Sequence, residues 1–98
     1  MSVEFHPQAA LELEDAVLYY NERQPGLGKQ LMQEVYTAID RIIAYPTAWT
    51  LLEGNIRRAL VHRFPYGLLY VANQDEIKIL AVMHLNRKPD YWKDRGKQ

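Results

Sequence analysis

Two amphipathic helical segments with a very short break between them constrain the fold of this chain more than any other feature. The first begins near Pro7 and the second ends before Pro46, and each carries an apolar stripe at helical spacing. The stripes consist of Leu13, Ala16, Val17 and Tyr20, then of Leu31, Val35, Ala38 and Ile42 with Ile39 and Ile43 beside them. Because only Gln24-Pro25-Gly26 separates the segments, the pattern predicts an antiparallel helical hairpin whose shared apolar face needs a covering layer.

The second half of the chain supplies that layer. Three segments have strand patterns and are separated by turn residues: Ile56 to His62, Leu68 to Ala72 and Ile77 to Leu85. The last is apolar on both faces for most of its length, as a central strand would be. A short candidate strand, Val3 to Phe5, precedes the helices. The predicted class is α+β: an N-terminal strand, the hairpin, a three-stranded antiparallel meander (β-α-α-β-β-β), and a short C-terminal tail, Asn86 to Gln98, forming a turn or helical stub.

Length and composition indicate one ordinary folded domain over residues 1–98. Of the 98 residues, 48% are hydrophobic, and none is cysteine. The lack of cysteine excludes a disulfide framework, a thiolate zinc site and a cysteine nucleophile. No apolar run approaches the roughly 20 residues that span a bilayer, and no signal segment precedes the first strand, so we expect a cytoplasmic protein.

Charge is distributed unevenly along the chain although the total is zero. The residues before Gly54, the first half, include three basic and eight acidic ones, whereas those after it, the second half, include nine basic and four acidic ones. The halves therefore carry −5 and +5. Either the basic half attracts a polyanionic partner, or the halves neutralise each other within the fold. Glu12, Glu14 and Asp15 fit a solvated helix face.

Most residues that could carry chemistry lie in the second half. They are Arg57, Arg58, His62, Arg63, Tyr66, His84, Arg87, Tyr91 and Trp92. Arginine suits phosphate because its guanidinium presents paired donors and stays charged. Arg57 and Arg58 are adjacent on a strand and so point to opposite faces. If the strand reaches His62, Arg57 shares a face with Arg63, and Arg58 with His62.

His84 stands where the last strand changes from apolar to polar. Its imidazole can there reach a ligand and move a proton near neutral pH, or it can make a structural hydrogen bond. The three histidines lack metal-ligand spacing, and no glycine-rich phosphate loop is present. Gly26 and Gly28 instead fit the start of the second helix. We therefore expect no metal or cofactor.

Tyr91 and Trp92 stand among Lys88, Lys93 and Arg95. Aromatic side chains in such a setting can stack on unpaired bases while the cations hold phosphates. They can also fold back as a cap on the sheet. Both alternatives are compatible with the sequence.

Together these segments resemble the RelE/ParE superfamily of bacterial toxins, the stable components of type II toxin–antitoxin pairs. The resemblance covers nearly the whole chain. Besides the hairpin it involves Phe5-His6-Pro7, Arg57-Arg58, Arg63-Phe64-Pro65-Tyr66-Gly67-Leu68-Leu69-Tyr70, Ile79-Leu80-Ala81-Val82-Met83-His84 and Arg87-Lys88-Pro89-Asp90-Tyr91-Trp92. A strand that ends in histidine and is soon followed by arginine is typical of the ParE-like side.

The resemblance implies a sheet packed on a helical hairpin, and a toxin that an antitoxin protein holds inactive. On the ParE-like side the toxin binds and blocks DNA gyrase, and the contact residues would be Arg57, Arg58, Arg63, Tyr66, Arg87, Tyr91 and Trp92.

On the RelE-like side it is a metal-independent, ribosome-dependent mRNA endonuclease. There His84 or Tyr91 would deprotonate the ribose 2′-hydroxyl. Arg63 and Arg87, or alternatively Arg58, would stabilise the phosphate.

One departure from the family favours gyrase inhibition. The best-known ribonuclease members carry general acid/base lysines in the first strand after the helices, where this chain has Arg57 and Arg58, which are poor proton donors. A degenerate member that only binds its antitoxin is a third possibility. The implied partners are an antitoxin and either gyrase or the ribosome with its mRNA, and not a membrane. A homodimer and a toxin–antitoxin hetero-oligomer are both compatible with this reading.

Overall fold

The computed structural model describes residues 1–88 and 90–96, so Pro89 and the last two residues of the expected tail lie outside the description. Its elements are β1 (Ser2–Phe5), α1 (Pro7–Arg23), α2 (Leu27–Ala44), β2 (Thr50–Glu53), β3 (Ile56–Leu60), β4 (Tyr66–Ala72), β5 (Glu76–His84) and the 3-10 helix η1 (Lys93–Gly96). The predicted α+β class and the order of its elements are confirmed. The sheet has one strand more than predicted, β2.

The helical hairpin begins and turns at residues suited to those positions. His6 is the N-cap of α1, where its Nδ1 accepts a hydrogen bond from the Gln8 N–H at 3.1 Å, and Pro7 occupies the first turn. Gly26 precedes α2 with φ of 89°, a left-handed conformation that glycine adopts without strain. The predicted place of the two glycines at the start of the second helix is therefore confirmed.

Gly28 lets the two helices approach closely at the turn of the hairpin. A Cβ atom at this position would overlap the carbonyl oxygen of Val17 and the side chain of Asn21. The Gly28 N–H, an unsatisfied donor of the first helical turn, donates to Asn21 Oδ1 at 2.8 Å. The contact is thus both a close packing site and a helix cap.

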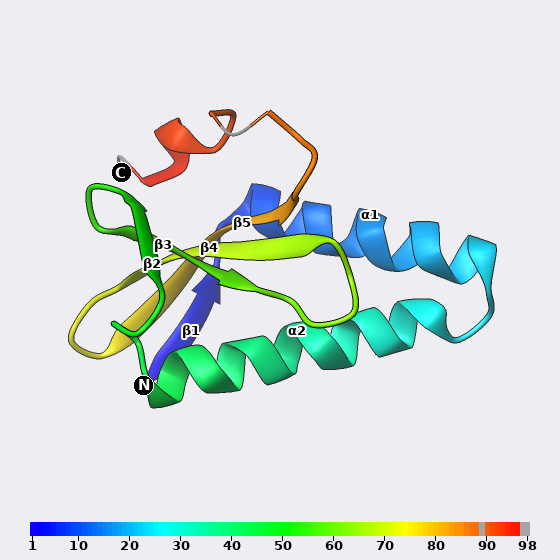
Figure 1. The fold of residues 1–98 in the computed structure, drawn as a ribbon, viewed down its shortest axis with the longest axis horizontal. Coiled ribbons are helices and arrows are strands. Elements are labelled where there is room, and N and C mark those ends of the chain that lie inside the picture. The colour runs from blue at the N-terminus through cyan, green and yellow to red at the C-terminus, as the bar shows by residue number, and fades with distance from the viewer. Residues whose placement is uncertain (89, 97–98) are drawn as a thin grey trace.

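The five strands form one sheet in the order β1-β5-β4-β3-β2 (Figure 1). β3, β4 and β5 make the expected antiparallel meander, and β2 extends it antiparallel to β3. β1 pairs with β5 in parallel, with Val3 opposite Ile77. β5 therefore lies in the interior of the sheet, in agreement with its apolar residues on both faces.

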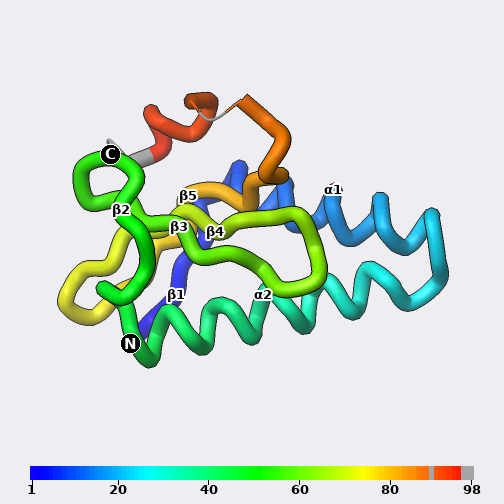
Figure 2. The backbone as a smooth tube through the Cα atoms, viewed as in Figure 1, coloured from blue at the N-terminus to red at the C-terminus, as the bar shows by residue number. Residues whose placement is uncertain are grey.

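Each face of the sheet has its own apolar cluster. The backbone tube in Figure 2 shows the helices and the C-terminal tail on different sides of the strands. On one face, here the helix side, α1 and α2 cover Ala59, Val61, Leu68, Tyr70, Ile77, Ile79 and Val82. On the opposite face, the tail side, the C-terminal tail packs Trp92 against Ile56, Leu69, Leu80, Ala81 and Met83. Trp92 is 3% exposed, so it caps the sheet, one of the two alternatives that the sequence left open.

A bulge in β5 determines which way the end of that strand faces. Leu69 lies opposite Ala81 but the next residue, Tyr70, lies opposite Ile79, so Leu80 is the extra residue. Leu80 and Ala81 both belong to the tail-side cluster. Beyond the bulge, Val82 returns to the helix side.

β3 ends earlier than predicted. It stops at Leu60 instead of His62, and Arg63 adopts a left-handed conformation with φ of 72°. Such a conformation is rare for residues other than glycine and ends the extended chain. The predicted strand alternation that placed Arg63 on the face of Arg57 is therefore wrong. Neither α-helix in the described ranges has the length and apolar character needed to cross a bilayer.

Candidate functional site

The structure distributes the predicted site residues over several places. Arg57 Nη1 donates to the carbonyl oxygen of Trp49 at 2.7 Å, and the neighbouring Tyr70 hydroxyl donates to that of Pro46 at 2.8 Å. Both contacts hold the connection between α2 and β2. Arg57 therefore has a structural partner instead of pointing freely to solvent.

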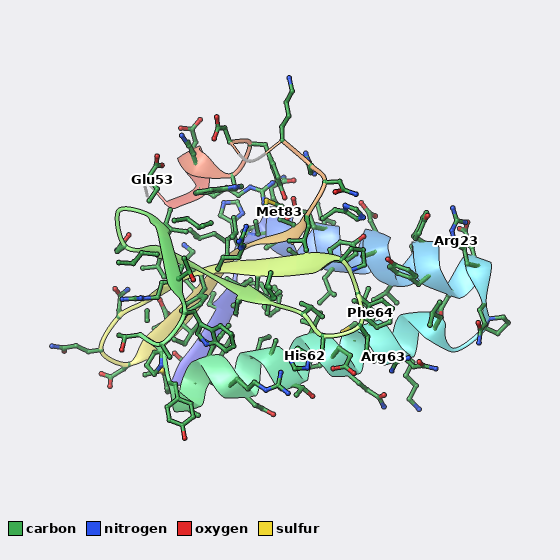
Figure 3. The ribbon with its side chains drawn as sticks, in the orientation of Figure 1. Arg23, Glu53, His62, Arg63, Phe64 and Met83 are labelled. Atoms are coloured by element: carbon green, nitrogen blue, oxygen red, sulfur yellow. The ribbon has the colours of Figure 1, made fainter. Side chains whose placement is uncertain are left out.

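His62 and Arg63 lie beside α2 (Figure 3). Arg63 donates to Gln30 Oε1 at 2.7 Å and lies 3.8 Å from the Glu34 carboxylate. Arg41 contacts His62 Nε2 at 3.4 Å. Arg58 is separate from this pair, because it lines a tail-side hollow of about 230 Å³ together with Met83 and Trp92.

Tyr66, His84 and Arg87 do come together, in a hollow beneath α1. Register pairing places Tyr66 opposite His84, and their rings meet edge to face with centroids 5.1 Å apart. The hollow, of about 280 Å³, is lined by Glu12, Asp15, Ala16 and Tyr19 from α1 and by Tyr66, Val82, His84 and Arg87. We call it the α1–β5 hollow.

Aromatic rings continue from this hollow along α1. The Tyr20 ring lies 5.1 Å from those of Tyr19 and Phe64, and 6.3 Å from that of Tyr66. The Arg23 guanidinium lies 3.9 Å from the centroid of the Tyr19 ring. Burial raises the pKa of both Tyr20 and Tyr66 above the usual value, so both phenols are neutral at physiological pH.

The hydrogen bonds of His84 define which of its nitrogens can accept a proton. Nδ1 accepts a hydrogen bond from the Asn86 N–H at 3.1 Å. A neutral imidazole has one donor and one acceptor nitrogen, so the proton of this ring is on Nε2. While the Asn86 contact is kept, neutral His84 therefore offers the hollow a donor and no proton acceptor.

Glu12 connects α1, β5 and the tail. Its Oε1 accepts hydrogen bonds from Arg95 Nη1 at 2.9 Å and from the Val82 N–H at 3.0 Å. Arg95 Nη1 also donates to the carbonyl of Leu80 at 3.1 Å, and Arg87 lies 3.6 Å from Glu12 Oε2. Because β1 pairs with β5 only as far as Ile79, no described strand lies beside this edge of β5 farther along. Glu12 and Arg95 satisfy the Val82 N–H and the Leu80 carbonyl there instead.

Tyr91 lies between two guanidinium groups. Arg87 is 3.6 Å and Arg95 5.0 Å from the centroid of its ring. Burial, and after it the Glu12 carboxylate, raises the pKa of Tyr91 to about 12. The hydroxyl lies near Glu12 but has no hydrogen-bond partner of good geometry among the described residues. Tyr91 is therefore protonated at physiological pH.

The two charge halves of the sequence pair with each other. Four ion pairs between residues that the structure describes join them: Glu34–Arg63, Glu12–Arg87, Glu53–Lys93 and Glu12–Arg95. Much of the positive charge of the second half is thus neutralised within the fold. Neutralisation within the fold, one of the two alternatives that the sequence left open, thus applies to four of the nine basic residues of the second half.

Sequence reasoning missed several residues of the hollow and its surroundings. Glu12 was expected on a solvated helix face, but its side chain is only 14% exposed. Asp15 and Tyr19 were not singled out for this site. Their spacing contained the signal: Glu12, Asp15, Ala16 and Tyr19 recur at i, i+3, i+4 and i+7, which places them on one helix face.

Within residues 1–88 and 90–96, no group of three or more histidine or acidic side chains is arranged to hold a metal ion. The chemistry that the hollow offers comes from its rings, its two carboxylates and Arg87.

Comparison with known proteins relates this chain to a family and to solved structures. Residues 3–89 match the family model described as the ParE toxin of the type II toxin–antitoxin system parDE. A chain of a solved structure, the chromosomal ParDE TA system from P. aeruginosa, superposes with a TM-score of 0.75 at 20% identity. This match covers 88% of the present chain and 97% of that chain, and it shows a shared fold. No curated protein matched.

Proposed function

Because the chain belongs to the ParE toxin family of type II toxin–antitoxin systems, we propose that it inhibits growth when free, by binding and blocking DNA gyrase in the cytoplasm. An antitoxin protein holds it inactive. The family match over residues 3–89 carries this proposal.

Exposed apolar residues on the helical hairpin support an antitoxin partner. Leu11 and Leu18 of α1 are 50% and 60% exposed, and Tyr36 of α2 is 53% exposed. Tyr36 also lines a hollow of about 260 Å³, together with Phe5, Ala10, Leu13, Glu14 and Met32. Exposed apolar side chains and an apolar hollow of this kind are typical of protein-binding surfaces. We assign this face to the antitoxin.

The geometry of the α1–β5 hollow favours inhibition by binding over RNA cleavage. A nuclease would need a scissile phosphate near His84, but the carboxylate of Asp15, which has no ion pair among the described residues, lines the same hollow and disfavours a phosphate there. The pKa of Tyr91 is about 12, so Tyr91 is not a ready base at neutral pH, and Nδ1 of His84 already accepts a hydrogen bond from the Asn86 N–H. These observations weigh against cleavage, and the family match supports gyrase as the target.

Expression of the chain without an antitoxin tests the proposal. We expect growth arrest with accumulated DNA breaks or blocked supercoiling and with intact mRNA, and inhibition of purified gyrase in a supercoiling assay. Codon-dependent mRNA cuts with normal supercoiling would contradict gyrase inhibition. Absence of arrest from a folded protein would favour the degenerate, antitoxin-binding alternative.

Charge reversal tests the proposed contact residues. Arg87 is 53% and Arg63 58% exposed, so both remain accessible despite their ion pairs. We expect the double variant Arg63→Glu/Arg87→Glu to inhibit gyrase more weakly than the parent. The matched control is Lys29→Glu on the exposed side of α2, which should inhibit as the parent does. Equal inhibition by all three proteins would remove these arginines from the contact surface.

A further inference from the structure

The α1–β5 hollow has room because its floor is small. Ala16 is 4% and Val82 2% exposed, and both line the hollow. On α1, Glu12, Asp15 and Tyr19 surround Ala16 at helical spacing. At about 280 Å³ the hollow is slightly below the usual size of a small-molecule site and suits one long side chain.

The walls of the hollow are aromatic. Tyr19 is 47% exposed, and Tyr66 and His84 are half-buried. Aromatic ring faces carry partial negative charge and attract cations, above all a guanidinium that can stack flat on them. Arg23 already stacks on Tyr19 at 3.9 Å and is not among the lining residues.

The charge of the hollow favours a cation. Asp15 is exposed and has no ion pair or hydrogen bond with any residue in the described ranges. Glu12 has Arg95 and Arg87 as partners. These two arginines offset the charge of Glu12, so Asp15 is the lining carboxylate that is left without a partner among the described residues.

We propose that the α1–β5 hollow binds an arginine side chain of a protein partner. Its guanidinium stacks on the rings of Tyr19 and Tyr66 and pairs with the carboxylate of Asp15. The planar shape of a guanidinium fits between rings better than the compact ammonium of lysine. The inference concerns the chemistry of recognition and does not depend on gyrase being the target.

Titration followed by NMR tests the proposal, with Nα-acetyl-arginine amide as the probe. We expect saturable shifts of the ring resonances of Tyr19, Tyr66 and His84. Nα-acetyl-citrulline amide, which has nearly the same shape without the charge, is the matched control and should produce no saturable shifts. Equal shifts with both compounds, or with neither, would overturn the proposal.

Variants locate the site. Asp15→Asn should weaken arginine binding about threefold, the range of an exposed ion pair. Tyr19→Leu should weaken it by a similar factor through the loss of a cation–π contact. Asp40→Asn removes an exposed carboxylate from α2 and should leave the affinity for the arginine probe unchanged.

Unchanged affinity in both hollow variants, or tighter binding of adenosine monophosphate than of the arginine probe, would also contradict an arginine site. Because the titration uses the toxin alone, its failure leaves the gyrase proposal intact, and the reverse is also true.

Discussion

At the scale of single residues, Glu12 has the most consequential contacts. It belongs to α1, yet it accepts a hydrogen bond from the backbone of β5 and pairs with Arg95 in the tail. Glu12 and Arg95 are each only 14% exposed, so water screens the pair weakly. The carboxylate therefore links three segments that are distant in sequence.

Replacing Glu12 with Gln should destabilise the fold by about 2 kcal/mol. The amide can still accept from the Val82 N–H, but the Arg95 guanidinium loses its counter-charge in a poorly solvated place. Urea denaturation measures the change. Glu14→Gln is the matched control, because Glu14 is exposed on the same helix and should change the free energy of unfolding by less than about 0.5 kcal/mol. Similar losses in both variants would show that the Arg95 pair contributes little.

Tyr91 should make the stability depend on pH in alkaline solution. Its pKa rises from 10.0 to about 12 on folding, so the fold favours the neutral phenol. This contribution to the free energy of unfolding is complete below pH 10 and is lost as the pH rises through 12. Urea denaturation of the parent and of Tyr91→Phe between pH 9 and about 11.5 should show a steeper decline in the parent.

At neutral pH the same substitution should be nearly neutral. The Tyr91 hydroxyl is buried without a hydrogen-bond partner in the described part of the chain, so its removal should change stability by less than about 1 kcal/mol. A larger loss at pH 7 would reveal a hydrogen bond to Glu12.

Candidate chemistry was only partly predictable at this scale. The position of His84 at the end of the last strand followed from the change in polarity, and its pairing with Tyr66 requires only antiparallel register. The role of Glu12 did not follow, because an acidic residue near a helix N-terminus is usually solvated. Its partner Arg95 is 83 residues away, and no local pattern connects them.

At the scale of elements, the helical hairpin depends on Gly28. Gly28→Ala should destabilise the fold by about 2–3 kcal/mol, because the added methyl group meets Val17 backbone and the Asn21 side chain. Gly26→Ala is the control: it introduces strain at positive φ but meets no atom within 4 Å, and should cost about 1 kcal/mol. Urea denaturation compares the two, and an equal or smaller loss for Gly28→Ala would contradict the close-contact interpretation.

Periodicity predicted the long elements and failed at short or irregular ones. Both helices and the three meander strands could be predicted because burial on one or both faces leaves a repeating pattern of apolar residues in the sequence. β2 is exposed at all four positions, so hydrogen bonding to β3 alone defines it. β3 ends at Leu60, shortly before the left-handed Arg63, and the bulge at Leu80 lies in the pairing of β5 with β4. Neither is encoded in apolar spacing.

At the scale of the whole molecule, opposite charges of the two halves meet across the fold. Three of the four ion pairs that join the halves involve a cation whose side chain is more than 40% exposed, so dissolved ions can screen them. We therefore expect the urea midpoint to fall when sodium chloride is raised from about 0.05 to 0.5 M. A rise would mean that repulsion within each half outweighs attraction between them.

The placement of β1 also constrains how the molecule is made. The first strand of the chain pairs with β5, the last one, and β5 joins β1 to the rest of the sheet. During translation, β1, α1 and α2 leave the ribosome before β5 has been synthesised. β5 is the strand that connects β1 to the rest of the sheet, which covers the helices. A chain that ends before residue 76 has no bridge between β1 and β4, and it also lacks Arg95 as the partner of Glu12. We therefore expect products that end before residue 76 not to form this sheet, and the complete fold to be reached only after β5 has been synthesised.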